Sequence, residues 1–194
     1  HDAFIVICDS LGKVLWAKRY STAGRDQAKS VVDCAAGLIV CGRHNNGLDG
    51  FVMVVDYTGT VKIDQSFPNS DFNEVKCTGD GGFVVVGESI REEKIVGVVL
   101  FGNSSGLVYH GAVFEFFNST DLARGYSAEV MLNRNIAILF ETSMGNSVRT
   151  VIAEYNVTSE SLVSWRFVGG EDTKSFGKSI FRSPQGGYVI GGSS

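Results

Sequence analysis

Proline, histidine and tryptophan are scarce in this sequence, with 2, 3 and 2 residues among 194. Long hydrophobic runs are missing as well, because stretches such as 96–101 (VGVVLF) are far too short to span a bilayer. Basic residues are not in excess, since the net charge is −4. We therefore expect neither membrane insertion nor a nucleic-acid partner.

The residue spacings of metal and nucleophile sites are also absent from the sequence. No C-x-x-C pair occurs, and the three histidines are too scattered to form a site with an acid or a thiol. We expect no metal, no cofactor and no catalytic residues. The cysteines lie in apolar strands, where a buried free thiol acts as a small hydrophobic group. For Cys34 and Cys77, at nearly matching positions of neighbouring repeats, a disulfide is the alternative.

Glycine, valine, isoleucine and phenylalanine are abundant, and together they indicate strands joined by tight turns. Four runs are continuously apolar, at 4–8, 51–55, 83–86 and 136–140. Such runs predict strands that are buried on both faces. A buried helix is the competing interpretation of any single run, but the β-branched residues and the regular turn spacing argue against it.

A repeat organises the chain. Segment 2–16 (DAFIVICDSLGKVLW) returns in degraded form as 49–63 (DGFVMVVDYTGTVKI). Each repeat reads as four short strands with turn signals between them, which is typical of an antiparallel meander. The predicted repeats span 28–67, 73–115 and 125–168, and a fourth is divided between 177–194 and 1–20.

The predicted fold is all-β: a β-propeller of four four-stranded antiparallel blades, one blade split between the two chain ends. The spacing supports the split, because Gly37 and Gly82 lie 45 residues apart, and 44 residues separate Gly187 from Gly37 when the chain is read as a circle. Two alternatives are a four-repeat slice of a longer array, and half-blades that pair between copies.

The motif D-[AG]-F-x-V-x-x-D-x-x-G-x-V-x-W at 2–16 and 49–63 resembles tandem β-propeller repeats of secreted and cell-surface proteins, mostly bacterial and archaeal. A second part, ending G-G-[FY]-V-[IV]-x-G, is seen at 179–192 and 74–87. The chain also distantly resembles quinoprotein blades, although segment 9–16 is one residue short of their docking motif. The resemblance implies the fold and an extracellular or cell-surface location, and it carries over no catalytic residues.

Polar residues recur on the strands that we expect to be innermost. One matching position holds Ser30, Glu74, Ser127 and Ser179. Two residues further on lie Val32, Lys76, Glu129 and Phe181. Polar groups that converge on a central channel are candidates for ligand binding, so Ser30, Glu74, Lys76, Ser127, Glu129 and Ser179 are the binding candidates. The alternative is that the charged members pair with one another and are structural.

Two kinds of motif fall in the turns. The Asp-x-x-Gly segments at 9–12 and 56–59 lack the further acidic residues that calcium needs, so we interpret them as hairpin turns. Asn103, Asn118 and Asn156 match the N-glycosylation pattern and should be exposed.

The leading functional hypothesis is a non-enzymatic extracellular binding or structural module whose partner is a protein, a glycan or copies of itself. One alternative is a subunit of an extracellular fibre, with strands paired between copies. Another is a polysaccharide-acting enzyme, which would need two carboxylates facing each other across a groove. The acidic loop residues available for that role are Glu92, Glu93, Asp121, Glu171 and Asp172.

Overall fold

A computed structural model describes residues 2–22, 24–47, 49–116, 122–131, 135–144, 147–169 and 174–193. These residues form β-strands and one short 3-10 turn, η1 (Asn45–Gly47). The strands are β1 (Ala3–Cys8), β2 (Val14–Tyr20), β3 (Gln27–Cys34), β4 (Gly37–His44), β5 (Asp49–Val55), β6 (Val61–Pro68), β7 (Ser70–Cys77), β8 (Phe83–Arg91), β9 (Lys94–Gly102), β10 (Val108–Phe114), β11 (Ala123–Val130), β12 (Asn135–Met144), β13 (Ser147–Asn156), β14 (Ser161–Val168), β15 (Phe176–Arg182) and β16 (Tyr188–Ser193).

The strands form antiparallel meanders. Three sheets have four strands each: unit 1 (β3–β6), unit 2 (β7–β10) and unit 3 (β11–β14). Two sheets have only two strands, namely the amino-terminal half-unit (β1–β2) and the carboxy-terminal half-unit (β15–β16). The prediction of an all-β chain built from four-stranded antiparallel sheets is confirmed.

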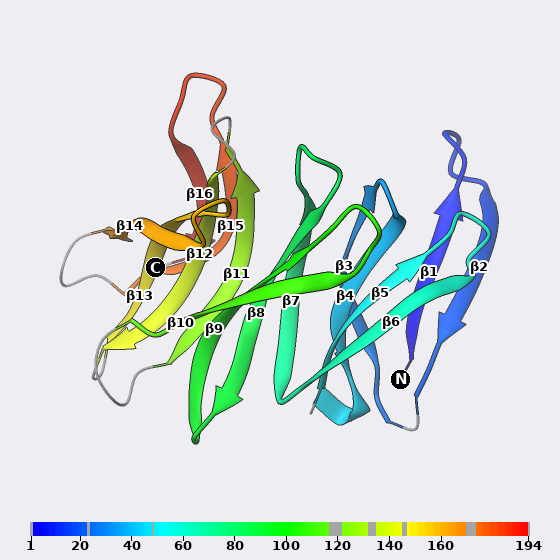
Figure 1. Cartoon of the computed structure of the whole chain (residues 1–194), viewed down its shortest axis with the longest axis horizontal. Helices are drawn as coiled ribbons and strands as arrows, with labels where there is room; N and C mark the ends of the chain where they lie inside the picture. Colours follow the sequence, from blue (N-terminus) through cyan, green and yellow to red (C-terminus); the bar gives the residue numbers. More distant parts are fainter. Residues whose placement is uncertain are drawn as a thin grey trace.

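The sheets lie side by side in a row, with the amino-terminal half-unit at one end and the carboxy-terminal half-unit at the other (Figure 1). The first strands of successive units contact each other: β3 contacts β7, β7 contacts β11, and β11 contacts β15. We call these four the inner strands. The half-units form separate sheets and do not clasp, so the expected closed ring of one chain is not the arrangement observed.

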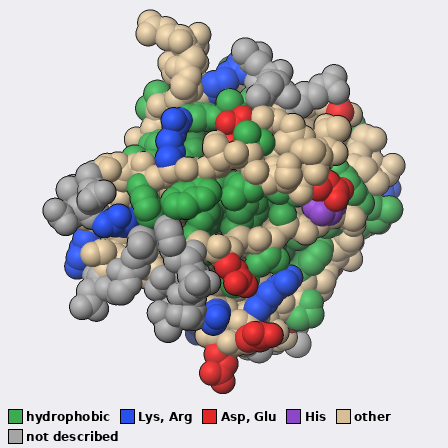
Figure 2. All heavy atoms as spheres, turned by 60° about the vertical axis from the view of Figure 1, so that its left-hand side comes forward, with side chains coloured by type: hydrophobic (Ala, Val, Ile, Leu, Met, Phe, Trp, Pro, Cys, Tyr) green, Lys and Arg blue, Asp and Glu red, His purple; other side chains and the backbone are tan. Residues whose placement is uncertain are grey.

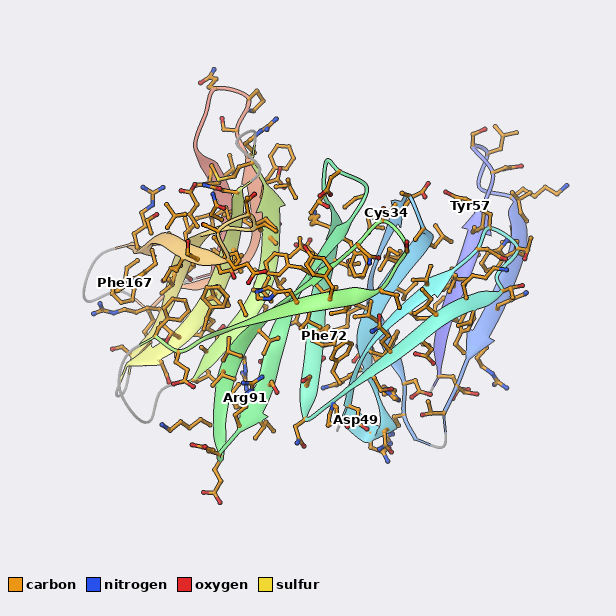
Figure 3. The ribbon with its side chains drawn as sticks, in the orientation of Figure 1. Cys34, Asp49, Tyr57, Phe72, Arg91 and Phe167 are labelled. Atoms are coloured by element: carbon orange, nitrogen blue, oxygen red, sulfur yellow. The ribbon has the colours of Figure 1, made fainter. Side chains whose placement is uncertain are left out.

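A separate hydrophobic cluster fills each space between neighbouring sheets. Phe72 of β7, for example, points into the space between units 1 and 2 and meets the Phe67 ring edge-on, with the ring centroids 5.4 Å apart (Figure 3). The runs 51–55, 83–86 and 136–140 are buried, as a strand with a sheet on both sides must be. The two-face burial predicted for these runs is confirmed.

The run 4–8 is the exception. Phe4 and Val6 are exposed, whereas the alternate residues Ala3 and Ile5 are buried, and Ile5 packs against unit 1. The prediction of two-face burial is therefore wrong here, because no sheet covers the outer face of the amino-terminal half-unit. Cys8 is exposed for the same reason, and only Cys41 is a fully buried thiol.

Each inner strand contains a β-bulge at the same point of the repeat. The pairing with the second strand shifts between Ala28 and Ser30, between Phe72 and Glu74, between Gly125 and Ser127, and between Gly177 and Ser179. Because the bulge recurs, it aligns the units residue by residue. Ser30, Glu74, Ser127 and Ser179 hold one matching position, as the sequence analysis proposed.

The Asp-x-x-Gly segments are hairpin turns. The Asp56 carboxylate accepts hydrogen bonds from the backbone N–H of Thr58 and Thr60, both 2.9 Å long. The Asp9 carboxylate makes the same two bonds in its own turn. The fourth residue, Gly12 or Gly59, has a φ of 81° or 78°, a left-handed conformation that glycine adopts freely. These bonds account for the motif as a turn.

The amino-terminal half-unit is tied to unit 1 by its second strand. The Trp16 indole N–H donates to the backbone oxygen of Tyr57 at 2.8 Å, and the Tyr20 hydroxyl donates to that of Gly59 at 3.0 Å. A tryptophan at the end of this motif thus docks one sheet on the next.

Candidate functional site

The polar residues of the inner strands come together as a row of links between units. The Ser30 hydroxyl accepts a hydrogen bond from the Val75 backbone N–H at 3.3 Å. One unit further on, a Glu74 carboxylate oxygen accepts from the Ala128 N–H at 2.8 Å and from the Ser127 hydroxyl at 2.7 Å. Each of these side chains therefore satisfies a backbone donor on the neighbouring inner strand.

The row continues to the last unit. The Ser127 hydroxyl accepts a hydrogen bond from the Ile180 N–H at 3.2 Å. Ser127 therefore donates to Glu74 of unit 2 and accepts from β15 of the carboxy-terminal half-unit. Ser179 holds the fourth position of the row and is exposed, because none of the described strands packs against this side of β15. The row was predicted from the sequence as a set of converging polar groups, and in the structure its members join the units.

The charged candidates lie next to the row. The Lys76 ammonium is 3.3 Å from the second carboxylate oxygen of Glu74, so these two pair with each other, as the structural alternative supposed. Glu129 is half-buried at the position that matches Lys76 in unit 3. A ligand role for these residues stays a prediction.

The bulge residues form a second row that the sequence analysis missed. The Lys29 ammonium donates to the Asn73 side-chain oxygen at 2.8 Å, and the Asn73 amide donates to the Gly125 backbone oxygen at 2.8 Å. At the other end, the Lys178 ammonium sits 3.6 Å from the centre of the Tyr126 ring, a cation–π contact. The four bulge residues are of three different types, and their shared place at the bulge is what relates them.

Ion pairs also cross from one unit to the next. Arg43 of β4 pairs with Asp71 of β7 at 3.2 Å, and Glu88 of β8 pairs with Arg124 of β11 at 2.7 Å. Burial raises the pKa of Glu88, and the Arg124 guanidinium offsets only part of this effect. An ion pair also joins unit 3 to the carboxy-terminal half-unit, where a Glu141 carboxylate oxygen of β12 lies 3.3 Å from the Lys178 ammonium of β15.

Cys34 and Cys77 are free thiols that lie near each other. Burial raises the pKa of Cys34, and the neighbouring Cys77 thiol raises it further. The two residues come from β3 and β7, so a bond between them would link units 1 and 2. The disulfide remains a prediction, which the nearness of the two thiols favours.

Two of the three glycosylation candidates lie among the described residues, Asn103 in the turn between β9 and β10 and Asn156 at the end of β13. Both are half-buried, so the expected exposure is not met, because their side chains are held by hydrogen bonds within the structure. The Asn103 side-chain oxygen accepts from the N–H groups of Ser105 and Leu107, at 3.0 and 3.1 Å. Asn156 is half-buried, and its amide donates to the Asn135 side-chain oxygen at 2.9 Å. Asn118 lies outside the described residues.

The carboxylates considered for an enzyme are not assembled in the part of the chain that is described. Glu92 and Glu93 are exposed at the tip of the β8–β9 hairpin, with φ of 48° and 66°. Asp121, Glu171 and Asp172 lie outside the described residues. Within the described ranges, no group of three or more His, Cys, Asp or Glu side chains could hold a metal ion. Nor do those ranges contain a helix long and apolar enough to cross a membrane.

A cleft of about 480 Å³ opens between β10 and β14 at the outer side of the row. Aromatic residues line it, among them Phe116, Tyr155 and Trp165, and His110 and Glu160 lie 3.7 Å apart at its border. Figure 2 turns this side of the molecule forward and shows a hydrophobic strip with a histidine and carboxylates at one end. The cleft was not predicted from the sequence, because its residues come from two separate units.

Comparisons with known proteins bear on the fold only. No family model and no curated protein matches the sequence. Seven solved chains are similar in structure. One is the crystal structure of a protein of unknown function from Bacteroides caccae at 1.35 Å resolution, with 13% sequence identity and a TM-score of 0.50. The match covers 97% of this chain and 82% of that chain.

Proposed function

We propose that the chain is a β-propeller-type repeat module that acts without catalysis, as a binding or structural element outside the cell or on its surface. The observation that carries the proposal is the row of links along the inner strands. Ser30, Glu74 and Ser127 each accept a backbone N–H of the next unit, so the most conspicuous polar pattern of the chain serves to hold units together.

The cleft between β10 and β14 is the surface that we assign to a protein or glycan partner. Its volume, about 480 Å³, is within the usual range for ligand sites. Aromatic rings give such a site a large apolar contact area, and a few polar groups at the rim give it orientation. Tyr155, His110 and Glu160 supply that combination here.

The extracellular location rests on the resemblance of the repeat motif to those of secreted and cell-surface proteins. The Asn103 turn is compatible with it, since the two serines that follow Asn103 are exposed. Glycosylation of that asparagine therefore belongs to this proposal.

Two experiments together distinguish a binding module from an enzyme: a glycan array, which measures binding, and an assay of polysaccharide cleavage. We expect glycan or protein binding that weakens at least fivefold in Leu162→Arg, which places a charge in the cleft, and no release of reducing ends from any polysaccharide. Exposed Leu11, far from this cleft in the β1–β2 turn, provides the matched control Leu11→Arg. Release of reducing ends that is lost in Glu160→Gln would overturn the non-enzymatic proposal.

A further inference from the structure

We propose that the two half-units complete each other between copies: β15–β16 of one copy docks beside β1–β2 of the next, forming a fourth four-stranded sheet and a head-to-tail chain. This inference deepens the structural side of the proposed function. It rests on the repeat architecture and not on the cleft between β10 and β14.

The inner strands differ in exposure at one repeat position. Val31, Val75, Ala128 and Ile180 hold one matching position, immediately after the row of linking residues. The last three are buried by the unit that precedes them, whereas Val31 is 55% exposed. The amino-terminal half-unit consists of a third and a fourth strand only, so the strands that would cover Val31 are missing from its side.

The second strands of the units also contain one exposed member among buried ones, here in the carboxy-terminal half-unit. Val189 matches Ile39, Val84 and Ala137, all of which are fully buried against the following unit. Val189 itself is 58% exposed, and its cross-strand neighbour Phe181 is 60% exposed. An apolar surface therefore faces outward where the next unit would begin.

The third strands complete the pattern. Phe4 and Val6 match Phe51 and Met53 of unit 1, because both strand pairs carry the same register shift near their ends. Phe51 and Met53 are buried, but Phe4 is 69% and Val6 41% exposed. The exposed members of these repeat positions thus lie in the two incomplete sheets, apart from Val31, which lies on the face of unit 1 that is turned towards the amino-terminal half-unit.

The exposed edges also fit in register. In unit 1 the second and third strands pair Val40 with Met53. Applied to the half-units, the same register places Ile190 opposite Val6 of the next copy. Ile190 packs towards unit 3, and Val6 faces away from its own unit 1, so both side chains would point to the same side of the new sheet. Strand addition to an open edge also satisfies its backbone groups.

A polar link would continue across the junction. Ser30, Glu74 and Ser127 each accept the N–H of the residue that matches Val31 in the next unit. Ser179 is the remaining member of that row and is exposed. In the assembly of copies, the Ser179 hydroxyl would accept a hydrogen bond from the Val31 N–H of the next copy, as the other members of the row do from the next unit.

Space for the docking strands is already present. Clefts of about 640 and 230 Å³ run along β1 and the neighbouring face of β3, lined by Phe4, Ala28, Val31 and Val40 among others. These are the places that the first two strands of a complete sheet would fill. Because the half-units lie at opposite ends of the row, a second copy is the occupant that reaches them, and this head-to-tail contact leaves an open end for further copies (Figure 1).

Cross-linking tests the junction. In a Cys8→Ser background, the double variant Val6→Cys/Ile190→Cys should give, on mild oxidation, a ladder of disulfide-linked multimers. The control Ile7→Cys/Ile190→Cys places the thiols on opposite faces of the sheet and should yield at most a tenth of that product. Adding Phe4→Lys to the first variant should suppress the ladder, while adding Leu11→Lys, at the tip of the β1–β2 turn, should leave it intact.

The other outcomes overturn the inference. An uncross-linked monomer means that the half-units do not pair between copies and are completed by another chain or by further repeats. A cross-link within one chain means that the ring closes on itself. Equal cross-linking of test and control rejects the register. In each case the absence of polysaccharide cleavage would leave the proposed function standing, so the two failures are distinguishable.

Discussion

The Glu74 carboxylate and the Ala128 backbone N–H, from neighbouring inner strands, meet at 2.8 Å. The same carboxylate oxygen also accepts the Ser127 hydroxyl, and the partner oxygen pairs with Lys76. One side chain thus joins the inner strands of units 2 and 3. This relationship recurs with serine at the junctions on either side.

Glu74→Ala should therefore destabilise the protein by about 2–3 kcal/mol, because it leaves the N–H of buried Ala128 and the hydroxyl of buried Ser127 without their charged acceptor. Urea unfolding followed by tryptophan fluorescence measures the change. Asp64→Ala, which removes an exposed carboxylate from β6, is the control and should change stability by less than about 0.5 kcal/mol. Equal effects of the two substitutions would contradict a linking role for Glu74.

A steric conflict explains why the second-strand motif ends in glycine. A Cβ on Gly87 would lie 2.1 Å from the Asp71 backbone oxygen, and Gly42 and Gly192 have the same conflict with Gln27 and Phe176. Gly87→Ala should destabilise unit 2 by about 2–3 kcal/mol through a forced backbone shift. Gly79→Ala, whose Cβ would meet nothing within 4 Å, should be tolerated in the same thermal melt. Equal melting temperatures of Gly87→Ala and Gly79→Ala would contradict the steric conflict at Gly87.

Asp26 gives the fold a defined acid sensitivity. Burial opposes its charged form, but hydrogen bonds from Thr22 and from the Asn45 N–H outweigh burial and hold the pKa of Asp26 below its usual value. Its contribution to stability is therefore present above the unfolded pKa of about 3.9 and is lost as the pH falls through the folded pKa.

Asp26→Asn should accordingly cost about 1–2 kcal/mol at pH 7 and progressively less as the pH falls below about 4. Denaturant titrations at a series of pH values measure the difference between variant and wild type. A difference that stays constant from neutral to acidic pH would show that the charge of Asp26 is not what matters.

Cys34 and Cys77 should form a disulfide under oxidising conditions, detected as a linked peptide pair by mass spectrometry without reduction. Because burial keeps the Cys34 thiol protonated at neutral pH, the reaction should be faster at alkaline pH. Closing this loop should add about 2–4 kcal/mol of stability. Cys34→Ser serves as the control, and alkylation of both thiols after prolonged oxidation of the wild type would disprove the pairing.

The strands and the alignment of the repeat units could be predicted from the sequence, because apolar runs and glycine turns are local signals. It also brought Ser30, Glu74, Ser127 and Ser179 to one position. It could not show that Phe4 is exposed while Phe51 is buried, since the two lie in nearly the same motif and differ only in whether another sheet covers them.

The bulge residues were missed for a different reason. Lys29 and Asn73 share a place defined by strand register, and no residue type is common to that place. The same holds for the cleft between β10 and β14, whose lining residues are remote in sequence. Contacts between units depend on the relative position of sheets, which the pattern within one repeat does not encode.

The most direct test of the central claim, that this chain is a row of repeat units with complementary unfinished ends, is the mass in solution by light scattering after size exclusion. We predict species at multiples of 20.9 kDa whose proportion rises with protein concentration. A single species of 20.9 kDa at every concentration would contradict the account.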